Sequence, residues 1–307
     1  MKKHFYIILF LFIFQNNYAQ DAGTSFIRIL GITQDGGYPH AGCNRKCCEQ
    51  VWQNDSLKKF VVSFALVDSF EKKWWLFEAT PDIKFQLQYF RNLTGAIYNY
   101  LPDGIFITHA HIGHYAGLME FGKEVMDTKN LPLYVLPRMK VFLETNGPWS
   151  QLVKLNNIVL NPLSEDAVLL LSEKIKVETF RVPHRDEFSE TAGFKIITST
   201  QKYLFIPDID KWDKWNRSII DEVKSVDVAL LDGTFFESNE LPGRKIIEVP
   251  HPLITETTGI FNPESRSTKE KIFFIHLNHT NPLLWNNDAK TDFKKQGFGV
   301  AEQGQKF

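Results

Sequence analysis

The chain has 307 residues and a formal net charge of -1, and 43% of the residues are hydrophobic, 14% aromatic and 23% charged. These proportions are typical of a globular protein with a large core, arranged as one large α/β domain or two small ones. Because the charges balance, they indicate neither a nucleic-acid partner nor an acidic membrane surface, and we expect a small-molecule substrate. The sequence gives no indication of the oligomeric state.

The N-terminus has the pattern of an export signal. Two lysines precede an apolar run from Phe5 to Phe14, and a polar stretch leads on to Ala19 and Gln20. This pattern predicts a secretory signal peptide over residues 1–20. The apolar run is short for a membrane span, although an uncleaved anchor is the alternative. We therefore expect an exported protein, periplasmic or secreted, with a single domain over residues 21–307 and no membrane attachment after cleavage.

Strands and helices alternate along the rest of the chain. Short apolar or alternating stretches predict strands at Phe26–Leu30, Val61–Val67, Trp74–Phe77, Ile105–Thr108, Leu133–Leu136, Val168–Leu171, Lys176–Val182, Gly193–Ile197, Tyr203–Ile206, Val228–Leu231 and Ile272–His276. Helical spacing of apolar residues predicts helices at Asp82–Leu93, Tyr115–Met126, Arg138–Thr145, Trp149–Lys154, Trp212–Val223 and Ile254–Phe261. Two strand-rich halves with helices outside indicate an α/β fold, a four-layer αββα sandwich.

The three cysteines, Cys43, Cys47 and Cys48, all fall within six residues. An exported protein that uses disulfides for stability normally spaces its cysteines along the chain and has an even number of them. A local disulfide with one free thiol is the alternative. The cluster favours thiolate ligands for a metal ion.

The segment Thr108–His114 carries an HxHxxH pattern directly after an apolar strand. His109 and His111 are two residues apart, so on an extended strand end their side chains point the same way. His114 begins the next turn and can reach the same point. Neutral imidazoles are good ligands for Zn²⁺, Fe²⁺ and Mn²⁺. The pattern therefore predicts a metal site at this strand end.

Three more potential ligands follow predicted strands in the second half of the chain. His184 comes after the strand that ends at Val182, Asp208 after the one that ends at Ile206, and His276 at the end of the last strand. Alone, each could be an ordinary polar residue at a strand end. Together with the HxHxxH segment, they predict one metal site built from several strand ends.

This order of ligands resembles that of the metallo-β-lactamase superfamily, over Phe26 to about Pro282. Finer strings resemble the branch of pyrroloquinoline quinone biosynthesis protein B. The similar strings are Leu30-Gly31, Gly36-Gly37-Tyr38-Pro39, Cys43, Ala79-Thr80-Pro81-Asp82, Val182-Pro183-His184-Arg185-Asp186-Glu187, Leu231-Asp232-Gly233-Thr234-Phe235 and His276-Leu277-Asn278-His279-Thr280-Asn281-Pro282.

The resemblance implies two metal positions in a four-layer sandwich. One ion would take His109, His111 and His184, a second would take His114 and His276, and Asp208 would bridge them. The ions would be zinc, or iron or manganese in its place, and would activate water for attack on an ester, amide, lactone or phosphodiester. An iron-dependent oxidase or hydroxylase and a non-catalytic metal binder are the alternatives.

One position departs from the superfamily pattern. Gly113 stands where the superfamily usually has an aspartate that ligates the second ion. Asp35, His40 and His251 are the candidates to replace it. We also predict a catalytic role for Asp208 and for His251, which could face the substrate, although a place on a surface loop is the alternative for His251.

The cysteine cluster also has a counterpart in the superfamily. Related phosphodiesterases have an N-terminal cysteine trio and a histidine three residues after the last active-site histidine. By this resemblance His279 would join Cys43, Cys47 and Cys48 around a structural zinc ion. Such a site would pin the first loop to the last strand and stabilise the fold.

Overall fold

The computed structural model of the chain describes residues 23–307, so the predicted signal peptide lies outside the described residues. Within that range, no helix is long and apolar enough to cross a membrane.

The described residues form two β-sheets. The first has six strands in the order in which they occur along the chain, β1 (Ser25–Gly31), β2 (Ser63–Asp68), β3 (Lys73–Phe77), β4 (Gly104–Phe106), β5 (Leu131–Val135) and β6 (Ile158–Pro162). The second has seven strands in reverse chain order, β13 (Gly299–Val300), β12 (Ile272–Ile275), β11 (Val228–Asp232), β10 (Lys202–Ile206), β9 (Thr191–Ile197), β8 (Lys176–Val182) and β7 (Val168–Leu170).

Helices flank both sheets. The α-helices are α1 (Lys46–Gln53), α2 (Ile83–Leu93), α3 (Ile112–Tyr115), α4 (Pro137–Thr145), α5 (Trp149–Lys154), α6 (Ile219–Lys224), α7 (Ile254–Phe261), α8 (Arg266–Lys269), α9 (Pro282–Trp285) and α10 (Asn287–Lys295). Short 3₁₀ helices are η2 (Asp55–Leu57), η3 (Ala116–Phe121), η4 (Trp212–Lys214), η5 (Ser238–Glu240) and η6 (Ile246–Glu248).

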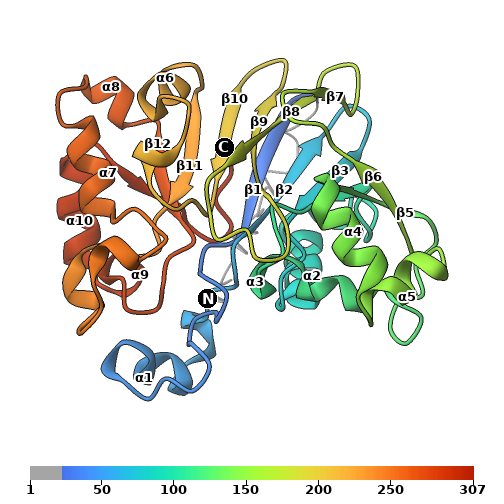
Figure 1. Cartoon of the computed structure of the whole chain (residues 1–307), viewed down its shortest axis with the longest axis horizontal. Helices are drawn as coiled ribbons and strands as arrows, with labels where there is room; N and C mark the ends of the chain where they lie inside the picture. Colours follow the sequence, from blue (N-terminus) through green and yellow to red (C-terminus); the bar gives the residue numbers. More distant parts are fainter. Residues whose placement is uncertain (1–22) are drawn as a thin grey trace, which may run out of the picture.

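The four layers follow from the two-residue period of the strands. In β2, Phe64 and Leu66 join the core between the sheets, while Ala65 and Val67 face the helices on the other side. Both faces of the strand are therefore buried, which explains its nearly continuous apolar sequence. Helices α2, α4 and α5 cover the first sheet, and α6, α7 and α10 cover the second (Figure 1). The predicted αββα sandwich is confirmed.

The helix predicted at Tyr115–Met126 is wrong. The α-helical turn α3 ends at Tyr115, and the chain continues as the 3₁₀ helix η3. The N–H of Gly117 donates to the carbonyl oxygen of Ala79 at 2.9 Å, and the N–H of Ala79 donates to the carbonyl oxygen of His114 at 2.9 Å. These bonds to a neighbouring loop take backbone groups that a continuous α-helix would pair internally.

The helix predicted at Trp212–Val223 is divided in two. The 3₁₀ helix η4 ends at an extended Trp215, and α6 begins only after Ser218, whose hydroxyl accepts from the N–H of Asp221. The indole N–H of Trp215 donates to the carbonyl oxygen of Arg181 in β8 at 2.9 Å. Docking of this side chain onto the sheet requires the extended backbone that interrupts the helix.

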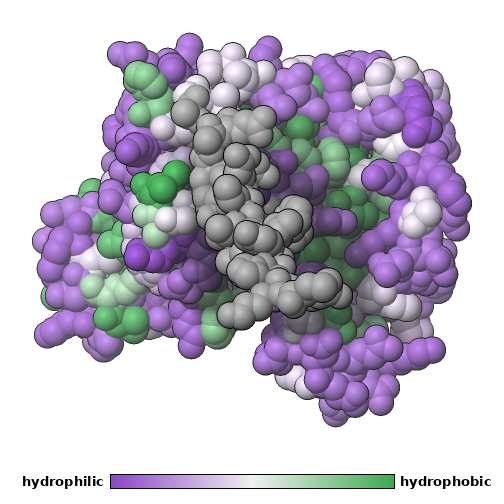
Figure 2. Space-filling model, turned by 180° about the vertical axis from the view of Figure 1, so that it is seen from behind, coloured by the Kyte–Doolittle hydropathy of each residue, from purple (hydrophilic) through white to green (hydrophobic). Residues whose placement is uncertain are grey.

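Helix α1, which the apolar pattern did not predict, extends below the two-sheet body in Figure 1. Seen from behind in Figure 2, this lobe is a mostly hydrophilic projection at the lower right. Its importance is that it carries Cys47 and Cys48 on consecutive positions of the helix.

Candidate metal centre

The candidate ligands lie where strands of both sheets end. Strands β10, β11 and β12 pair in parallel, so their carboxyl ends share one edge of the second sheet. Asp208 follows β10, Asp232 ends β11, and His276 follows β12. The HxHxxH segment follows β4 of the first sheet, and a neighbouring hydrogen bond joins the two sheets here, from the N–H of Ala192 to the carbonyl oxygen of Thr108 at 2.9 Å.

Asp208 lies at the middle of the cluster and is 2% exposed. Each of the five predicted histidine ligands has a ring nitrogen within 3.9 Å of one of its carboxylate oxygens. The distances are 3.4 Å for His109, 3.9 Å for His111, 3.8 Å for His114, 3.3 Å for His184 and 3.9 Å for His276. The side chains that sequence reasoning placed at separate strand ends therefore meet around one carboxylate.

Three groups of potential ligand atoms can be distinguished within this cluster, and the third consists of Asp208, His251 and His276. In each, the ligand atoms lie within 4.8 Å of one another. The first group is His109, His111, His184 and Asp208, and the second is Asp35, His114 and His276. The groups are joined through Asp208, since one of its oxygens lies 3.8 Å from the Nε2 atom of His114.

Polar contacts on the outer side of three rings, two hydrogen bonds and one ion pair, fix their orientation. The Nδ1 atom of His109 lies 2.9 Å from the hydroxyl of Thr108, and that of His276 lies 2.8 Å from the hydroxyl of Thr234. The Nδ1 atom of His114 lies 3.3 Å from a carboxylate oxygen of Glu78. The Nε2 atoms of all three rings are buried without a hydrogen-bond partner. Histidine ligands of metal ions are typically held in this way, with the outer nitrogen fixed and the inner one free.

Sequence reasoning missed Glu78, Thr108 and Thr234 as supporting residues. Glu78 is fully buried directly after β3, at a backbone φ of 69°. His276 also has a positive φ, 63°. Non-glycine residues rarely adopt this conformation, and it occurs preferentially where the surrounding structure imposes it at functional sites. A charged residue at the end of an apolar strand was the available signal for Glu78.

The charges of the centre favour a bound cation. Asp35, Glu78, Asp208 and Asp232 bring four carboxylates together, and no Lys or Arg among residues 23–307 forms an ion pair with any of them. Burial would raise the pKa of Asp208, but the surrounding histidines hold it well below its usual range. Burial opposes protonation of His114, but the carboxylates around it, that of Glu78 first, raise its pKa to about 9. The unpartnered imidazole nitrogens and these carboxylates fit a divalent transition-metal ion.

His251 belongs to this cluster and does not lie on an open surface loop. It is 8% exposed, and its Nδ1 atom lies 3.1 Å from Asp208 and 3.0 Å from Asp232. Burial opposes protonation, but the two carboxylates outweigh it and raise the pKa of His251 to about 10. A ring nitrogen between two carboxylates carries a proton, so His251 donates a hydrogen bond and does not offer this nitrogen to a metal ion.

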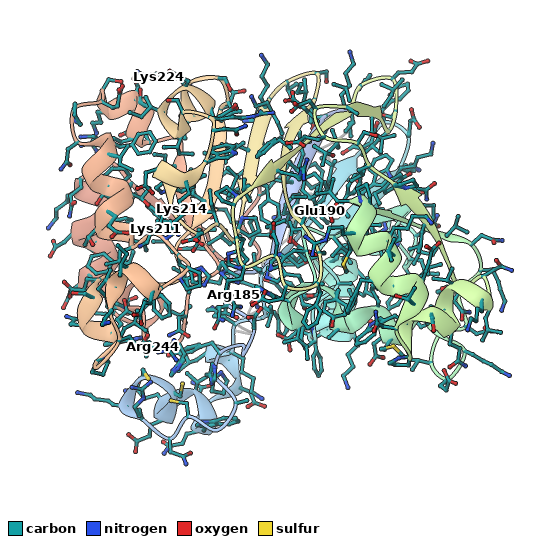
Figure 3. The ribbon with its side chains drawn as sticks, viewed as in Figure 1. Arg185, Glu190, Lys211, Lys214, Lys224 and Arg244 are labelled. Atoms are coloured by element: carbon teal, nitrogen blue, oxygen red, sulfur yellow. The ribbon has the colours of Figure 1, made fainter. Side chains whose placement is uncertain are left out.

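The side of the cluster that reaches solvent is formed by His111 and its neighbours. The Nε2 atom of His111 lies 3.1 Å from a carboxylate oxygen of Glu187, and the guanidinium of Arg185 lies 3.3 Å from the same ring nitrogen. Both charged side chains are about half exposed. Figure 3 shows Arg185 near the middle of the molecule, between its two halves. A cation therefore stands beside the accessible edge of the candidate centre.

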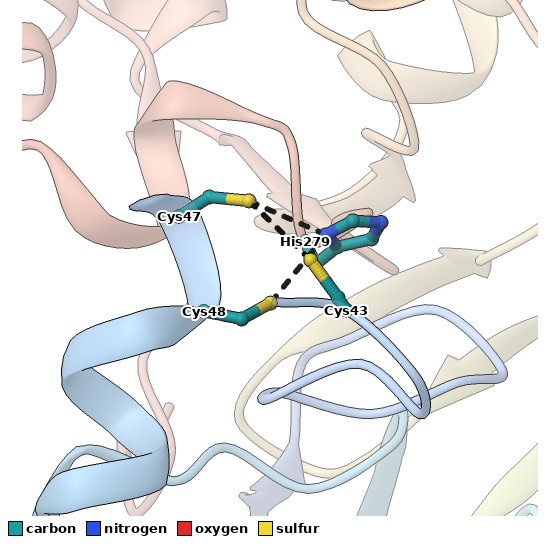
Figure 4. A group of neighbouring side chains, drawn as sticks. All are labelled: Cys43, Cys47, Cys48 and His279. Carbon is teal, nitrogen blue, oxygen red and sulfur yellow. Dashed lines mark hydrogen bonds between the residues drawn. The ribbon is translucent and has the colours of Figure 1, made fainter. Parts of the chain in front are cut away.

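The cysteine cluster forms a second candidate site, shown in Figure 4. The Sγ atoms of Cys47 and Cys48 each lie 3.5 Å from the Nδ1 atom of His279, and the Sγ atoms of Cys43 and Cys47 are 3.9 Å apart. All four ligand atoms lie within 4.8 Å of one another, and all three thiols are free. Burial lowers the pKa of His279 to about 4, which keeps its ring neutral and able to ligate. Three sulfurs and one imidazole nitrogen are a donor set typical of structural zinc.

His40, one of the three candidates to replace the missing aspartate, lies at this second site. Its ring packs on that of His279 with 4.4 Å between the ring centroids, and its backbone N–H donates to the Sγ atom of Cys48. Asp35 and His251 both lie among the potential ligand atoms of the histidine centre. Because the Nδ1 atom of His251 is paired with two carboxylates, Asp35 is the candidate that remains.

Residues 73–276 match the family described as the β-lactamase superfamily domain. The chain belongs to the metallo-β-lactamase superfamily. Among its relatives in this superfamily is coenzyme PQQ synthesis protein B of Methylorubrum extorquens, strain PA1, which is 24% identical over 90% of this chain and 97% of that protein. The corresponding protein of Klebsiella pneumoniae, strain 342, is 21% identical over 91% of this chain and 96% of its own length. These relatives support the branch that the sequence strings indicate.

Solved structures of the superfamily show the same fold. Zn²⁺-bound PqqB from Methylobacterium extorquens superposes with a TM-score of 0.74 at 21% identity, covering 92% of this chain and 99% of that one. A diphosphatase of the PhnP family superposes with a TM-score of 0.67 at 17% identity, covering 92% and 96%. Human tRNase Z, short form, gives 0.55 at 15% identity, covering 92% and 98%.

Proposed function

We propose that this superfamily member is an exported metal-dependent hydrolase that acts on an ester, amide, lactone or phosphodiester. The observation that carries the proposal is the convergence of five histidines on Asp208, four of which have a buried ring nitrogen without a hydrogen-bond partner. The similarity to a Zn²⁺-bound structure and to a diphosphatase supports it. The ion is zinc, or iron or manganese in its place.

The ligand residues divide into two positions around a shared carboxylate. His109, His111 and His184 would hold one ion, His114 and His276 would hold another, and Asp208 would contact both. Bound divalent ions acidify a water molecule and stabilise negative charge that develops on a carbonyl or phosphoryl oxygen.

The supporting side chains keep this arrangement in place. Thr108, Glu78 and Thr234 hold the outer nitrogens of three rings, which leaves the inner nitrogens directed at the centre. The Nδ1 atom of His251 donates a hydrogen bond to Asp232 at 3.0 Å, and its charge lies 3.1 Å from Asp208, an ionic contact that holds the shared carboxylate in place. We propose that the catalytic contribution of His251 is this positioning of Asp208.

Arg185 favours an anionic substrate within the proposed range. Its guanidinium is about half exposed beside His111, at the accessible edge of the centre. A phosphodiester, or an ester or lactone that carries a carboxylate, would place its charge within reach of this cation.

Metal content and hydrolysis together test the proposal. Protein purified without added metal is expected to hold a transition metal and to hydrolyse a generic phosphodiester or lactone substrate. The variant His109→Ala should lose most of the activity and at least part of the metal content, while Lys214→Gln, at an exposed side chain paired with Asp210, should retain both. Protein that holds no transition metal at the histidine centre would contradict the proposal.

An iron-dependent oxidase or hydroxylase is the second candidate, favoured by the similarity to coenzyme PQQ synthesis protein B. Iron as the resident metal, together with substrate-dependent oxygen consumption, would select it over hydrolysis. Metal binding without any activity that depends on His109 would instead select a non-catalytic metal binder.

The last part of the proposal concerns the N-terminal segment and the location of the mature protein. We propose that residues 1–20 are removed and that residues 21–307 form a single mature domain in the periplasm or outside the cell. Mass spectrometry of the protein from a fractionated culture is expected to find a new N-terminus close to Ala19. Full-length protein in the cytoplasmic fraction would contradict this part of the proposal.

A further inference from the structure

The second metal position, at His114 and His276, has too few protein ligands to hold an ion firmly. His114 and His276 supply two imidazoles, and Asp208 is shared with the first group. Transition-metal sites in proteins normally have at least three protein ligands, and structural zinc has four. A further side-chain ligand is therefore needed if a second ion is to be held firmly.

Asp35 has the position of such a ligand. Its Oδ1 atom lies 3.6 Å from the Nε2 atom of His114, and it is buried without a hydrogen-bond partner. The other oxygen, Oδ2, accepts from the side-chain amide of Gln34 at 3.0 Å, which orients the carboxylate. An unpartnered oxygen and an unpartnered imidazole nitrogen that face each other are the arrangement expected around an absent cation.

Gly113 shows that the space for this carboxylate is part of the fold. A Cβ atom at position 113 would lie 2.0 Å from the Oδ1 atom of Asp35 and 2.7 Å from its Cα atom. Gly113 does not have a positive φ, so its backbone conformation does not require glycine. The requirement is the close approach of Asp35, which occupies the room that a side chain at position 113 would need.

The backbone places the loop of Asp35 beside His276. Thr33 forms a parallel bridge with Leu277, and the N–H of Gln34 donates to the carbonyl oxygen of Leu277 at 3.0 Å. In the other direction, the N–H of Leu277 donates to the carbonyl oxygen of Ile32 at 2.8 Å. The residue after His276 is thus tied to the residues just before Asp35, which holds both side chains at the same point.

We propose that Asp35 is a ligand of the second metal position and replaces the carboxylate that Gly113 lacks. The second ion, a divalent transition metal, is held by Asp35, His114 and His276 with the shared Asp208. This inference rests on the proposed metal-dependent function and adds to it the side chain that completes the ligands of the second ion.

Metal stoichiometry and cobalt spectra test the proposal. The variant Asp35→Asn is expected to hold one ion fewer per chain than the wild type. After cobalt(II) substitution, it should retain the thiolate-to-metal absorption of the cysteine site, which shows that the loss is confined to the histidine centre. Glu165→Gln removes a carboxylate that pairs with Arg181 and belongs to none of the ligand groups, so it is the control, with unchanged stoichiometry. Equal metal content in Asp35→Asn and the wild type would overturn the proposal.

A second variant gives a positive signal that a purely structural role of Asp35 would not produce. Asp35→Cys offers a thiolate at the same position, so its cobalt(II) form should gain thiolate-to-metal absorption beyond that of the wild type. Absence of the added absorption in folded protein would overturn the proposal. If the wild type holds only one ion at the histidine centre, the proposal for Asp35 is wrong but the metal-dependent function stands. If the wild type holds no ion there, the metal-dependent function itself is wrong.

Discussion

The hydroxyl of Thr234 lies 2.8 Å from the Nδ1 atom of His276 and donates at 2.7 Å to the Oδ1 atom of Asp232. The hydroxyl donates to Asp232 and accepts from His276, so the proton of this ring is on Nδ1 and the lone pair is on Nε2, which faces the centre. A residue two positions after the end of β11 thus sets the tautomer of a candidate ligand directly after the neighbouring strand, β12.

Removal of this hydroxyl should weaken metal binding without removing a ligand. Thr234→Val is expected to lower the affinity of the histidine centre for zinc by roughly 10- to 100-fold, the usual range for loss of an outer hydrogen bond to a ligating histidine. Competition with chelators of graded strength measures the affinity. Thr234→Ser keeps the hydroxyl and should bind zinc nearly as the wild type does. Unchanged affinity in Thr234→Val would show that Thr234 does not orient His276.

Glu78 should contribute to the stability of the protein even without metal. Its Oε1 atom lies 3.3 Å from His114, and its Oε2 atom accepts from the N–H of Thr108 at 3.2 Å, both fully buried. Glu78→Ala would leave the buried N–H of Thr108 unpaired and remove the carboxylate beside His114, so we expect the free energy of unfolding of the chelated protein to fall by about 1–3 kcal/mol. Urea denaturation measures it. Glu78→Gln, which keeps a polar group of the same size, should be milder; equal losses would argue against this account.

A side chain at position 113 should be poorly tolerated. Gly113→Ala places a methyl group 2.7 Å from the Cα atom of Asp35, and overpacking of this kind typically costs about 1–3 kcal/mol. Gly259 in α7 is the matched control, because nothing lies within 4 Å of a Cβ atom there. Gly259→Ala should be neutral or stabilising by up to about 1 kcal/mol. Thermal unfolding compares the two, and similar behaviour of both variants would contradict the packing argument.

The cysteine site should behave as a zinc site and not as a disulfide. A strong chelator is expected to lower the melting temperature, while a mild reductant without chelating groups should leave it unchanged. Cys48→Ser removes a fully buried potential ligand and should lose one zinc ion per chain. The reverse pattern, sensitivity to reductant and indifference to chelator, would favour a local disulfide.

Arg185 should affect substrate affinity more than turnover. Arg185→Gln is expected to raise KM for an anionic substrate by about tenfold, which corresponds to roughly 1.4 kcal/mol. KM for an uncharged ester should change little, and kcat should fall less than KM rises. Steady-state kinetics with a charged and an uncharged substrate separate these effects. An equal change of KM for both substrates would mean that Arg185 acts through His111 and not through the charge of the substrate.

The apolar pattern of the sequence was sufficient to predict the layers of this fold, because strand and helix periods are local properties. All eleven predicted strands exist, while β6 and β13 were not predicted. The two wrong helices, at Tyr115–Met126 and Trp212–Val223, failed where hydrogen bonds to distant segments replaced those within the helix. Helix α1 was missed because only Cys48 and Val51 are buried in it and five of its eight residues are exposed.

For the candidate centre, the sequence determined the types and order of the potential ligands, since residues at strand ends can be identified from the strands that precede them. Only the tertiary structure decided that His251 pairs with Asp208 and Asp232, that His40 lies at the cysteine site, and that Asp35 fills the space beside Gly113. These relationships join loops that are far apart in the chain. Their distances depend on how the two sheets pack, and no local pattern of residues contains that information.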